Sequence, residues 1–220
     1  MKKTAIILGA TGLTGSILLE KLLNDDRYKS IKLFSRKEIE GLPSKVNQYV
    51  GNLFELENFK ADFTGDEVYC CIGTTAKRTP DKAIYKAIDY GIPVASAKLS
   101  KENGIPAYLV VSALGANAKS SIFYNKTKGE MEHDVLSQEI DHTYILQPSL
   151  IEGNRKEQRI GEQIGLVLFK LVQPLFIGKL KKYRSTEAEH IAQAMINLAN
   201  STSSAQIITS DKIREIAKEH

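Results

Sequence analysis

The chain has 220 residues, a net charge of +4, 42% hydrophobic and 25% charged residues, and two cysteines. This length suits one domain with a substantial core, and the composition is typical of a water-soluble globular protein. The small, scattered positive charge argues against a nucleic-acid-binding protein. The longest apolar stretch, residues 164–177, is too short and too interrupted by polar residues to span a bilayer, so we expect no membrane partner.

Short apolar runs alternate with segments of helical periodicity along the first two thirds of the chain. Strands are predicted at residues 4–8, 31–35, 46–50, 67–71, 107–112 and 143–147, and helices at residues 14–24, 81–90, 93–103 and 122–139. This alternation predicts an α/β fold: a doubly wound parallel sheet whose ligand lies across the carboxyl ends of the strands. The sequence Gly91-Ile92-Pro93 is expected to break or kink the helical region around it.

The regular alternation fades after Pro148. A polar stretch (152–159), an amphipathic segment (160–177) and a basic run (179–184) precede a helix (186–200), a strand (206–209) and a final helix (211–218). We therefore expect a single domain with a cofactor core at residues 1–148 and a small α/β extension on the substrate side at residues 149–220.

A glycine-rich turn joins the first predicted strand to the first helix. It reads Gly9-Ala10-Thr11-Gly12-Leu13-Thr14-Gly15. Gly9 permits the tight turn, Gly12 lets backbone approach a pyrophosphate, and Gly15 lets the helix pack close to the strand. The amides and positive dipole end of the helix then face the phosphates. This order of elements predicts a dinucleotide site at Gly9, Thr11, Gly12, Leu13, Thr14 and Gly15.

Residues after the next three predicted strands indicate which dinucleotide binds. The second strand ends at Ser35, Arg36 and Lys37, where an acidic residue would bind the ribose of NAD. A hydroxyl and two cations favour NADP(H), with NAD(H) still permitted. Asn52 and Leu53 follow the third strand, where adenine contacts form. Gly73, Thr74 and Thr75 follow the fourth, either beside the cofactor or as a plain turn of small polar residues.

A candidate catalytic group follows the fifth predicted strand. Ser112 ends that strand, and Tyr124 and Lys128 lie four residues apart, on one face of the next helix. An ammonium near a phenol favours the phenolate, so we expect Lys128 to lower the pKa of Tyr124. Ser112 would hold a carbonyl oxygen while Tyr124 transfers the proton. The alternative is a surface tyrosine beside a solvated lysine.

Histidine and cysteine usage points to no metal chemistry. The four histidines are dispersed, so no metal site is predicted. Cys70 and Cys71 are adjacent on a strand, point to opposite faces and are expected to be buried, reduced thiols. Because no segment resembles a signal peptide, we expect a cytoplasmic location.

Three motifs resemble atypical short-chain dehydrogenases/reductases, and within them the Tat-interacting-protein oxidoreductase family. They are Ile7 to Gly12 with Gly15, Cys70-Cys71-Ile72-Gly73-Thr74-Thr75, and Tyr124 to Glu130, and the likeness extends from about residue 3 to 149 and more loosely to 200. The resemblance implies a Rossmann fold that binds NADPH, with Arg36 at the 2′-phosphate, Tyr124 as catalytic acid/base, Lys128 on the nicotinamide ribose and Ser112 polarising the substrate.

The resemblance also assigns a loop and exposes one departure. Pro148, Ser149, Leu150 and Ile151 match the loop that passes the nicotinamide. Many active members carry an asparagine on the helix after the fourth strand, but this chain reads Ala87-Ile88-Asp89-Tyr90. Either Asp89 replaces that asparagine or the proton relay is absent.

The leading hypothesis is an NADP(H)-dependent oxidoreductase that acts on a carbonyl or alcohol group of a small, apolar molecule. The first alternative is a non-catalytic module that senses NADP(H) and binds a protein partner. The second is an epimerase that uses the cofactor transiently. None of these readings fixes the substrate or the oligomeric state.

Overall fold

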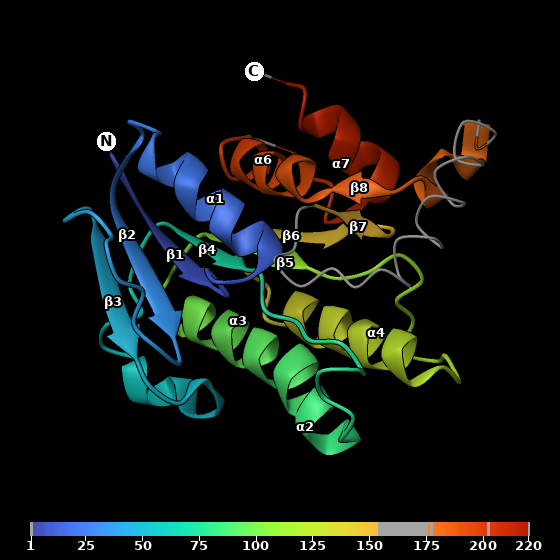
Figure 1. Cartoon of the computed structure of the whole chain (residues 1–220), viewed down its shortest axis with the longest axis horizontal. Coiled ribbons are helices and arrows are strands. Elements are labelled where there is room, and N and C mark those ends of the chain that lie inside the picture. The colour runs from blue at the N-terminus through green and yellow to red at the C-terminus, as the bar shows by residue number, and fades with distance from the viewer. Residues whose placement is uncertain (1, 154–175, 177, 202, 220) are drawn as a thin grey trace.

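The central feature of the computed structural model, which describes residues 2–153, 176, 178–201 and 203–219, is a sheet of seven strands (Figure 1). In chain order the strands are β1 (Lys3–Leu8), β2 (Tyr28–Ser35), β3 (Val46–Val50), β4 (Glu67–Cys70), β5 (Ala107–Val111), β6 (His142–Gln147) and β9 (Ile207–Thr209). Their spatial order is β3-β2-β1-β4-β5-β6-β9, and every adjacent pair is parallel. The predicted doubly wound parallel sheet is confirmed.

Helices cover both faces of this sheet (Figure 1). One face carries α1 (Leu13–Leu23), α6 (Ala188–Ala199) and α7 (Ser210–Ile216), and the other carries α2 (Lys82–Lys86), α3 (Ile92–Glu102) and α4 (Phe123–Leu136). Each face of the sheet has its own hydrophobic core, and successive strand residues point alternately into one and the other. Ile7 and Leu109 pack on the α1 side, and Leu8 and Val110 pack on the α3 side. Burial on both faces explains why the strands are almost continuously apolar.

The helical region around Pro93 is distorted rather than broken. Helix α2 continues through a π-helical turn (Ala87–Gly91) directly into α3, which has Pro93 in its first turn. A proline has no N–H, and its ring crowds the carbonyl four residues earlier, here that of Asp89. The wider π turn is a known way to accommodate such a fault, and such turns are frequent at functional sites.

The C-terminal part of the chain returns to the main sheet. Strand β9 pairs with β6, and the predicted helix 186–200 is α6, preceded by the two-residue strand β8 (Thr186–Glu187). Strand β8 pairs with β7 (Ile151–Glu152) in a second small sheet that the sequence analysis did not predict. The predicted polar stretch 152–159 and amphipathic segment 160–177 lie almost entirely outside the described residues.

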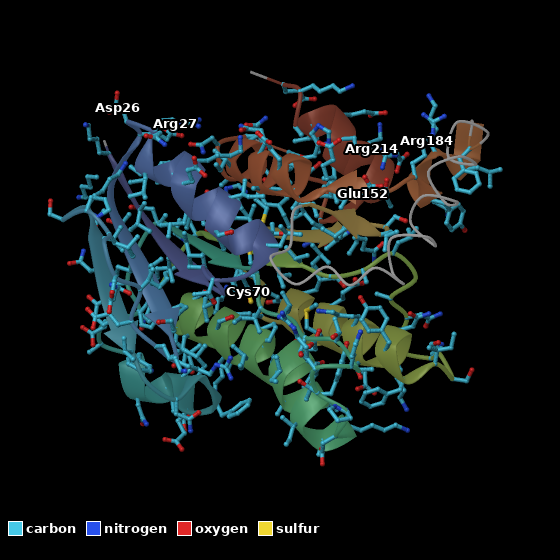
Figure 2. All side chains as sticks on the ribbon, viewed as in Figure 1. Asp26, Arg27, Cys70, Glu152, Arg184 and Arg214 are labelled. Atoms are coloured by element: carbon cyan, nitrogen blue, oxygen red, sulfur yellow. The ribbon has the colours of Figure 1, made fainter. Side chains whose placement is uncertain are left out.

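Arg214 of α7 holds the basic run (179–184) against the C-terminal helix by hydrogen bonds. That run forms a 3-10 helix (Gly178–Tyr183). The guanidinium donates hydrogen bonds to the carbonyls of Lys181 (2.6 Å), Arg184 (3.1 Å) and Ser185 (3.2 Å), beside the labelled Arg184 in Figure 2. No helix among the described residues has the length and apolarity needed to cross a membrane.

A buried carboxylate ties the first strands to the end of α6, at the edge of the sheet opposite the glycine turn. Glu67 is 1% exposed and accepts hydrogen bonds from the hydroxyls of Tyr28 (2.7 Å) and Tyr69 (2.6 Å) and from the ammonium of Lys3. Asn200 donates to the Tyr28 hydroxyl (2.9 Å). Each polar group therefore has a partner, which is the condition for burying a charge.

Candidate functional site

The glycine turn between β1 and α1 has the geometry that its spacing predicts. Gly9 has a φ of +88°, and the Gly12 amide donates to the Gly9 carbonyl (3.0 Å). A Cβ on Gly9 would lie 2.8 Å from the carbonyl carbon and oxygen of Cys71, and one on Gly15 would lie 2.1 Å from the Gly9 oxygen. Neither position has room for a side chain, because strand, turn and helix pack backbone against backbone.

The same turn leaves an anion-binding helix end open. Among the described residues no side chain caps α1, and its first turn contains no acidic residue. Thr11 and Gly12 are exposed. Free amides and the positive end of the helix dipole therefore face outward at the carboxyl edge of the sheet. This cradle fits the diphosphate of a nicotinamide dinucleotide.

The residues predicted for the adenosine end lie at the carboxyl ends of β2 and β3. The hydroxyl of Ser35 donates to the Lys37 carbonyl (2.6 Å), while Arg36 is exposed and forms no ion pair with any described residue. Asn52 caps a 3-10 helix (Leu53–Phe59) that the sequence did not predict. Leu53 is 4% exposed and packs in the core, which leaves its backbone as the part that could touch a ligand.

The loop after β4 is ordered by its own polar groups. Thr74 donates its amide to Asp89 Oδ2 (2.7 Å), and its hydroxyl bonds the hydroxyl of Thr79 (2.9 Å). The Thr75 carbonyl accepts from the Thr79 amide (2.9 Å). A Cβ on Gly73 would meet Asp89 Oδ1 at 3.5 Å. The predicted loop of small residues is thus fixed against the π-helical turn.

The predicted nicotinamide-side loop lies near the glycine turn. The Pro148 carbonyl accepts from the Leu114 amide (2.8 Å), the Leu150 carbonyl accepts from the Thr186 amide (2.9 Å), and Ile151 begins β7. A Cβ on Gly153 would lie 2.9 Å from the methyl groups of Leu13. Gly153, two residues beyond the predicted loop, therefore lies against Leu13 of the glycine turn.

Tyr124, Lys128 and Glu132 form a stripe along α4 at intervals of four residues. Tyr124 is 40% exposed, whereas Lys128 is 4% exposed and its Nζ lies 2.9 Å from Asp89 Oδ1. The predicted pair of Tyr124 and Lys128 is thus joined by a third residue, the buried carboxylate of Asp89. Asp89, whose part in a proton relay stays a prediction, is thus in an ion pair with this lysine.

The expected lowering of the Tyr124 pKa is wrong for the chain alone. Burial raises the pKa of this phenol; Lys128 acts in the opposite direction, and Asp89 raises the pKa further. Lys128 is visible from its spacing to Tyr124, whereas Asp89 acts on the phenol only through tertiary packing.

Ser112, predicted to polarise the substrate, is occupied with another partner. It is 4% exposed, and its hydroxyl donates to Glu132, which also accepts from Gln147 Nε2 at 2.9 and 3.0 Å. Burial raises the pKa of the Glu132 carboxyl, although Ser112, Gln147 and Lys128 oppose that shift. A role for Ser112 on substrate stays a prediction and would require its hydroxyl to turn. The spacing of Glu132, four residues after Lys128, was the sequence signal for this partner.

A pocket of about 430 Å³ opens beside Tyr124. Its wall comes from the loop after β4, from α2 and from the start of α4, and consists of Thr74, Thr75, Ala76, Thr79, Pro80, Lys82, Tyr85, Phe123 and Tyr124. The rings of Tyr85 and Phe123 meet edge to face at 5.6 Å, and Lys82 Nζ lies 5.5 Å from the Phe123 ring. This volume and mainly apolar wall suit a small molecule. Sequence reasoning identified only Thr74, Thr75 and Tyr124 among these residues.

Metal-ligating side chains and thiols are the other reactive groups to be placed. Among the described residues no cluster of histidine, cysteine, aspartate and glutamate could hold a metal. Cys70, labelled near the centre of the molecule in Figure 2, and Cys71 are both free thiols. Burial raises the pKa of both, so neither is an activated nucleophile.

Fold and glycine cradle together define a dinucleotide-binding protein of the Rossmann class. A family model described as NAD(P)H-binding matches residues 9–202, and the chain belongs to this family, among the atypical short-chain dehydrogenases/reductases.

Relatives and solved structures agree with this family. The chain is 34% identical to Protein FMP52, mitochondrial, of Candida albicans (86% of each chain) and 30% identical to Protein HTATIP2 of Rattus norvegicus (76% of this chain, 70% of the relative). It superposes on the UDP-glucose 4-epimerase of Thermotoga maritima with a TM-score of 0.70 at 14% identity, covering 98% of this chain and 81% of the epimerase. At that identity the likeness shows the fold alone.

The expectation of a cytoplasmic location is contradicted by these relatives. The proteins from Candida albicans, Debaryomyces hansenii and Scheffersomyces stipitis are all named as mitochondrial. Buried, reduced cysteines are compatible with several compartments, and addresses are read by receptors rather than set by the core, so the composition carried no information on this point.

Proposed function

We propose that this protein is an NADP(H)-dependent oxidoreductase that interconverts a carbonyl and an alcohol on a small, largely apolar molecule. The observation that carries the proposal is the position of Tyr124, which lines the pocket and shares a helix face with Lys128. The phenol is half-exposed beside a space of substrate size, on the carboxyl side of a sheet whose glycine turn fits a diphosphate.

The cofactor would lie across the carboxyl ends of the strands. Gly9, Gly12 and Gly15 form the diphosphate cradle, and exposed Arg36 would grip the 2′-phosphate that distinguishes NADP(H) from NAD(H). Lys128 would bind the nicotinamide ribose. When bound, the nicotinamide supplies or accepts the hydride.

Tyr124 would act as the general acid or base. In the reducing direction, its hydroxyl gives a proton to the carbonyl oxygen as the carbonyl carbon gains hydride, and the phenolate then regains a proton from solvent. Its 40% exposure provides that solvent contact. Tyr85 and Phe123 would shape the pocket for an apolar substrate, because aromatic walls favour apolar surface.

Replacing Tyr124 with phenylalanine tests this role. NADPH oxidation is followed with a panel of small aldehydes and ketones, and NADPH affinity is measured separately. Loss of general acid catalysis should lower turnover by about 10²- to 10⁴-fold while the dissociation constant for NADPH changes little. Tyr183→Phe is the matched control, because Tyr183 is 44% exposed and lies outside the pocket. Full turnover by Tyr124→Phe would remove Tyr124 from the mechanism.

The second candidate is an NADP(H)-sensing module that binds a protein partner and turns over little. It is favoured by one observation: the Ser112 hydroxyl and the Lys128 ammonium are both engaged with carboxylates. This candidate predicts tight NADPH binding, no oxidation with any carbonyl compound, and a partner whose capture depends on the cofactor. Steady NADPH oxidation with one compound excludes it.

A further inference from the structure

The buried ion pair between Asp89 and Lys128 joins three segments around the site. Asp89 is fully buried, with Oδ1 2.9 Å from Lys128 Nζ on α4 and Oδ2 accepting from the Thr74 amide (2.7 Å) in the loop after β4. The carboxylate itself belongs to the π-helical turn between α2 and α3. One side chain thus sets the position of a helix and of a loop that both face the pocket.

The free energy of folding alone does not explain why a carboxylate is buried at this position. Aspartate is a weak helix former, and a buried ion pair often adds little to folding compared with apolar side chains. Pro93, four residues later, has no N–H to donate to the Asp89 carbonyl, so a regular helix could not continue unchanged through this turn. Buried charges and π turns of this kind concentrate at functional sites.

The charged and titratable groups around Tyr124 come from three elements among the described residues. Lys128 lies on α4, Asp89 in the π-helical turn, and Tyr85 and Lys82 on α2. Lys128 stabilises the phenolate, and the carboxylate of Asp89, paired with that lysine, acts in the opposite direction. The partial burial of Tyr124 adds to the effect of Asp89, and the pKa of the phenol is raised.

We propose that Asp89 is a positioning residue: it holds the Lys128 ammonium and the Thr74 loop in place and offsets the charge of the lysine, so that Tyr124 stays a protonated phenol. The protonated form is the one that gives a proton to a carbonyl, so the rate of reduction holds across neutral pH. Only this last consequence rests on the proposed function.

Titration of the phenol tests the inference without any substrate. Phenolate absorbance in the near ultraviolet is recorded against pH for the whole protein and for its Tyr124→Phe variant, and the difference isolates Tyr124. In the Asp89→Asn background, the midpoint of this difference should fall by about 1 to 3 pH units, because the ammonium of Lys128 is no longer offset. An unchanged or higher midpoint in a folded Asp89→Asn protein overturns the inference.

Asp134→Asn is the matched control. Asp134 also lies on α4 and accepts a hydrogen bond from a phenol, that of Tyr90 (2.5 Å), but it does not contact Lys128. The midpoint for Tyr124 should stay at the wild-type value in this variant. An equal shift in both variants would mean a general loss of negative charge, and would overturn the specific role of Asp89.

Activity supplies a second readout that separates this inference from the proposed function. In the reducing direction, kcat should fall at alkaline pH, and Asp89→Asn should move that fall to lower pH by the same amount as the titration. If the Tyr124 midpoint shifts but no carbonyl compound is reduced, the role of Asp89 stands and the proposed oxidoreductase function is refuted. If a carbonyl compound is reduced but the midpoint does not shift, the proposed function stands and the role of Asp89 is refuted.

A double-variant cycle keeps the test decisive if Asp89→Asn alone does not fold. Lys128→Met leaves the buried carboxylate facing the phenol, so the Tyr124 midpoint should rise above wild type. Adding Asp89→Asn to Lys128→Met removes both charges, and the midpoint should fall back. Equal midpoints in the single and double variants would show that the carboxylate exerts no field on Tyr124.

Discussion

Substitutions at Gly15 and Gly12 should distinguish the role of the glycine turn in folding from its role in cofactor binding. A Cβ at Gly15 would lie 2.1 Å from the Gly9 oxygen, so α1 must retreat by about 0.9 Å to restore even a 3.0 Å separation. Forcing a methyl group into a tightly packed site typically costs about 1–3 kcal/mol. For a chain of this size, Gly15→Ala should therefore lower Tm by roughly 2–12 °C. The displaced helix should also bind NADPH more weakly.

Gly12→Ala should behave differently. Its Cβ would lie 3.3 Å from the Gly9 oxygen, a contact relieved by a few tenths of an ångström, so Tm should change by less than about 2 °C. The methyl group would instead occupy the space through which the diphosphate approaches, and the dissociation constant for NADPH should rise at least about tenfold, or about 1.4 kcal/mol.

Circular dichroism follows unfolding, and the fluorescence of bound NADPH follows affinity free of tryptophan emission, because the chain has no tryptophan. Gly91→Ala is a control, since a Cβ there meets no atom within 4 Å. Wild-type Tm in Gly15→Ala, or wild-type NADPH affinity in Gly12→Ala, would refute the packing argument.

Two further predictions concern charge. Arg36→Ala should raise the dissociation constant for NADPH about 10- to 100-fold and leave that for NADH unchanged, because only NADPH carries the phosphate; equal losses for both cofactors would contradict this assignment. Burial raises the pKa of the Glu132 carboxyl above its ordinary 4.5, so the stability that this group contributes is complete below about pH 4.5 and is lost as pH rises through the folded-state pKa. The Tm of wild type relative to Glu132→Gln should therefore be highest at acid pH and fall toward neutral pH, and a difference independent of pH would contradict the shift.

The sheet could be predicted from sequence because its signals are local. Strands buried on both faces are continuous apolar runs, and the glycines at positions 9, 12 and 15 fix the first turn, so the main strands were found within a few residues. Strand β2 begins at Tyr28, three residues before its predicted start, because the segment from Tyr28 to Ser30 is mixed in character. Strands β7 and β8 have two residues each, too few to carry any periodicity.

Contacts within the candidate site were predictable where both residues share one element. The spacing of Tyr124 and Lys128 is visible along a single helix, and both lie on the predicted face. The partners that decide their chemistry come from elsewhere: Asp89 from the π-helical turn, and Gln147 from the end of β6, where it reaches Glu132. Such contacts depend on tertiary packing, so charge at the phenol could not be summed from local sequence.

The carboxylate network at the amino edge has a consequence for synthesis of the chain. Lys3, in the first strand, bonds Glu67 and also the carbonyl of Ala199 (3.2 Å) and the side chain of Asn200 (2.8 Å). A nascent chain that has emerged only as far as β6 still lacks α6, which covers α1, and Asn200, whose side-chain amide donates to the Tyr28 hydroxyl. The nucleotide cradle is encoded first, yet its supporting layer is made last, so a ribosome-bound intermediate would expose apolar surface until residue 200 or so is released.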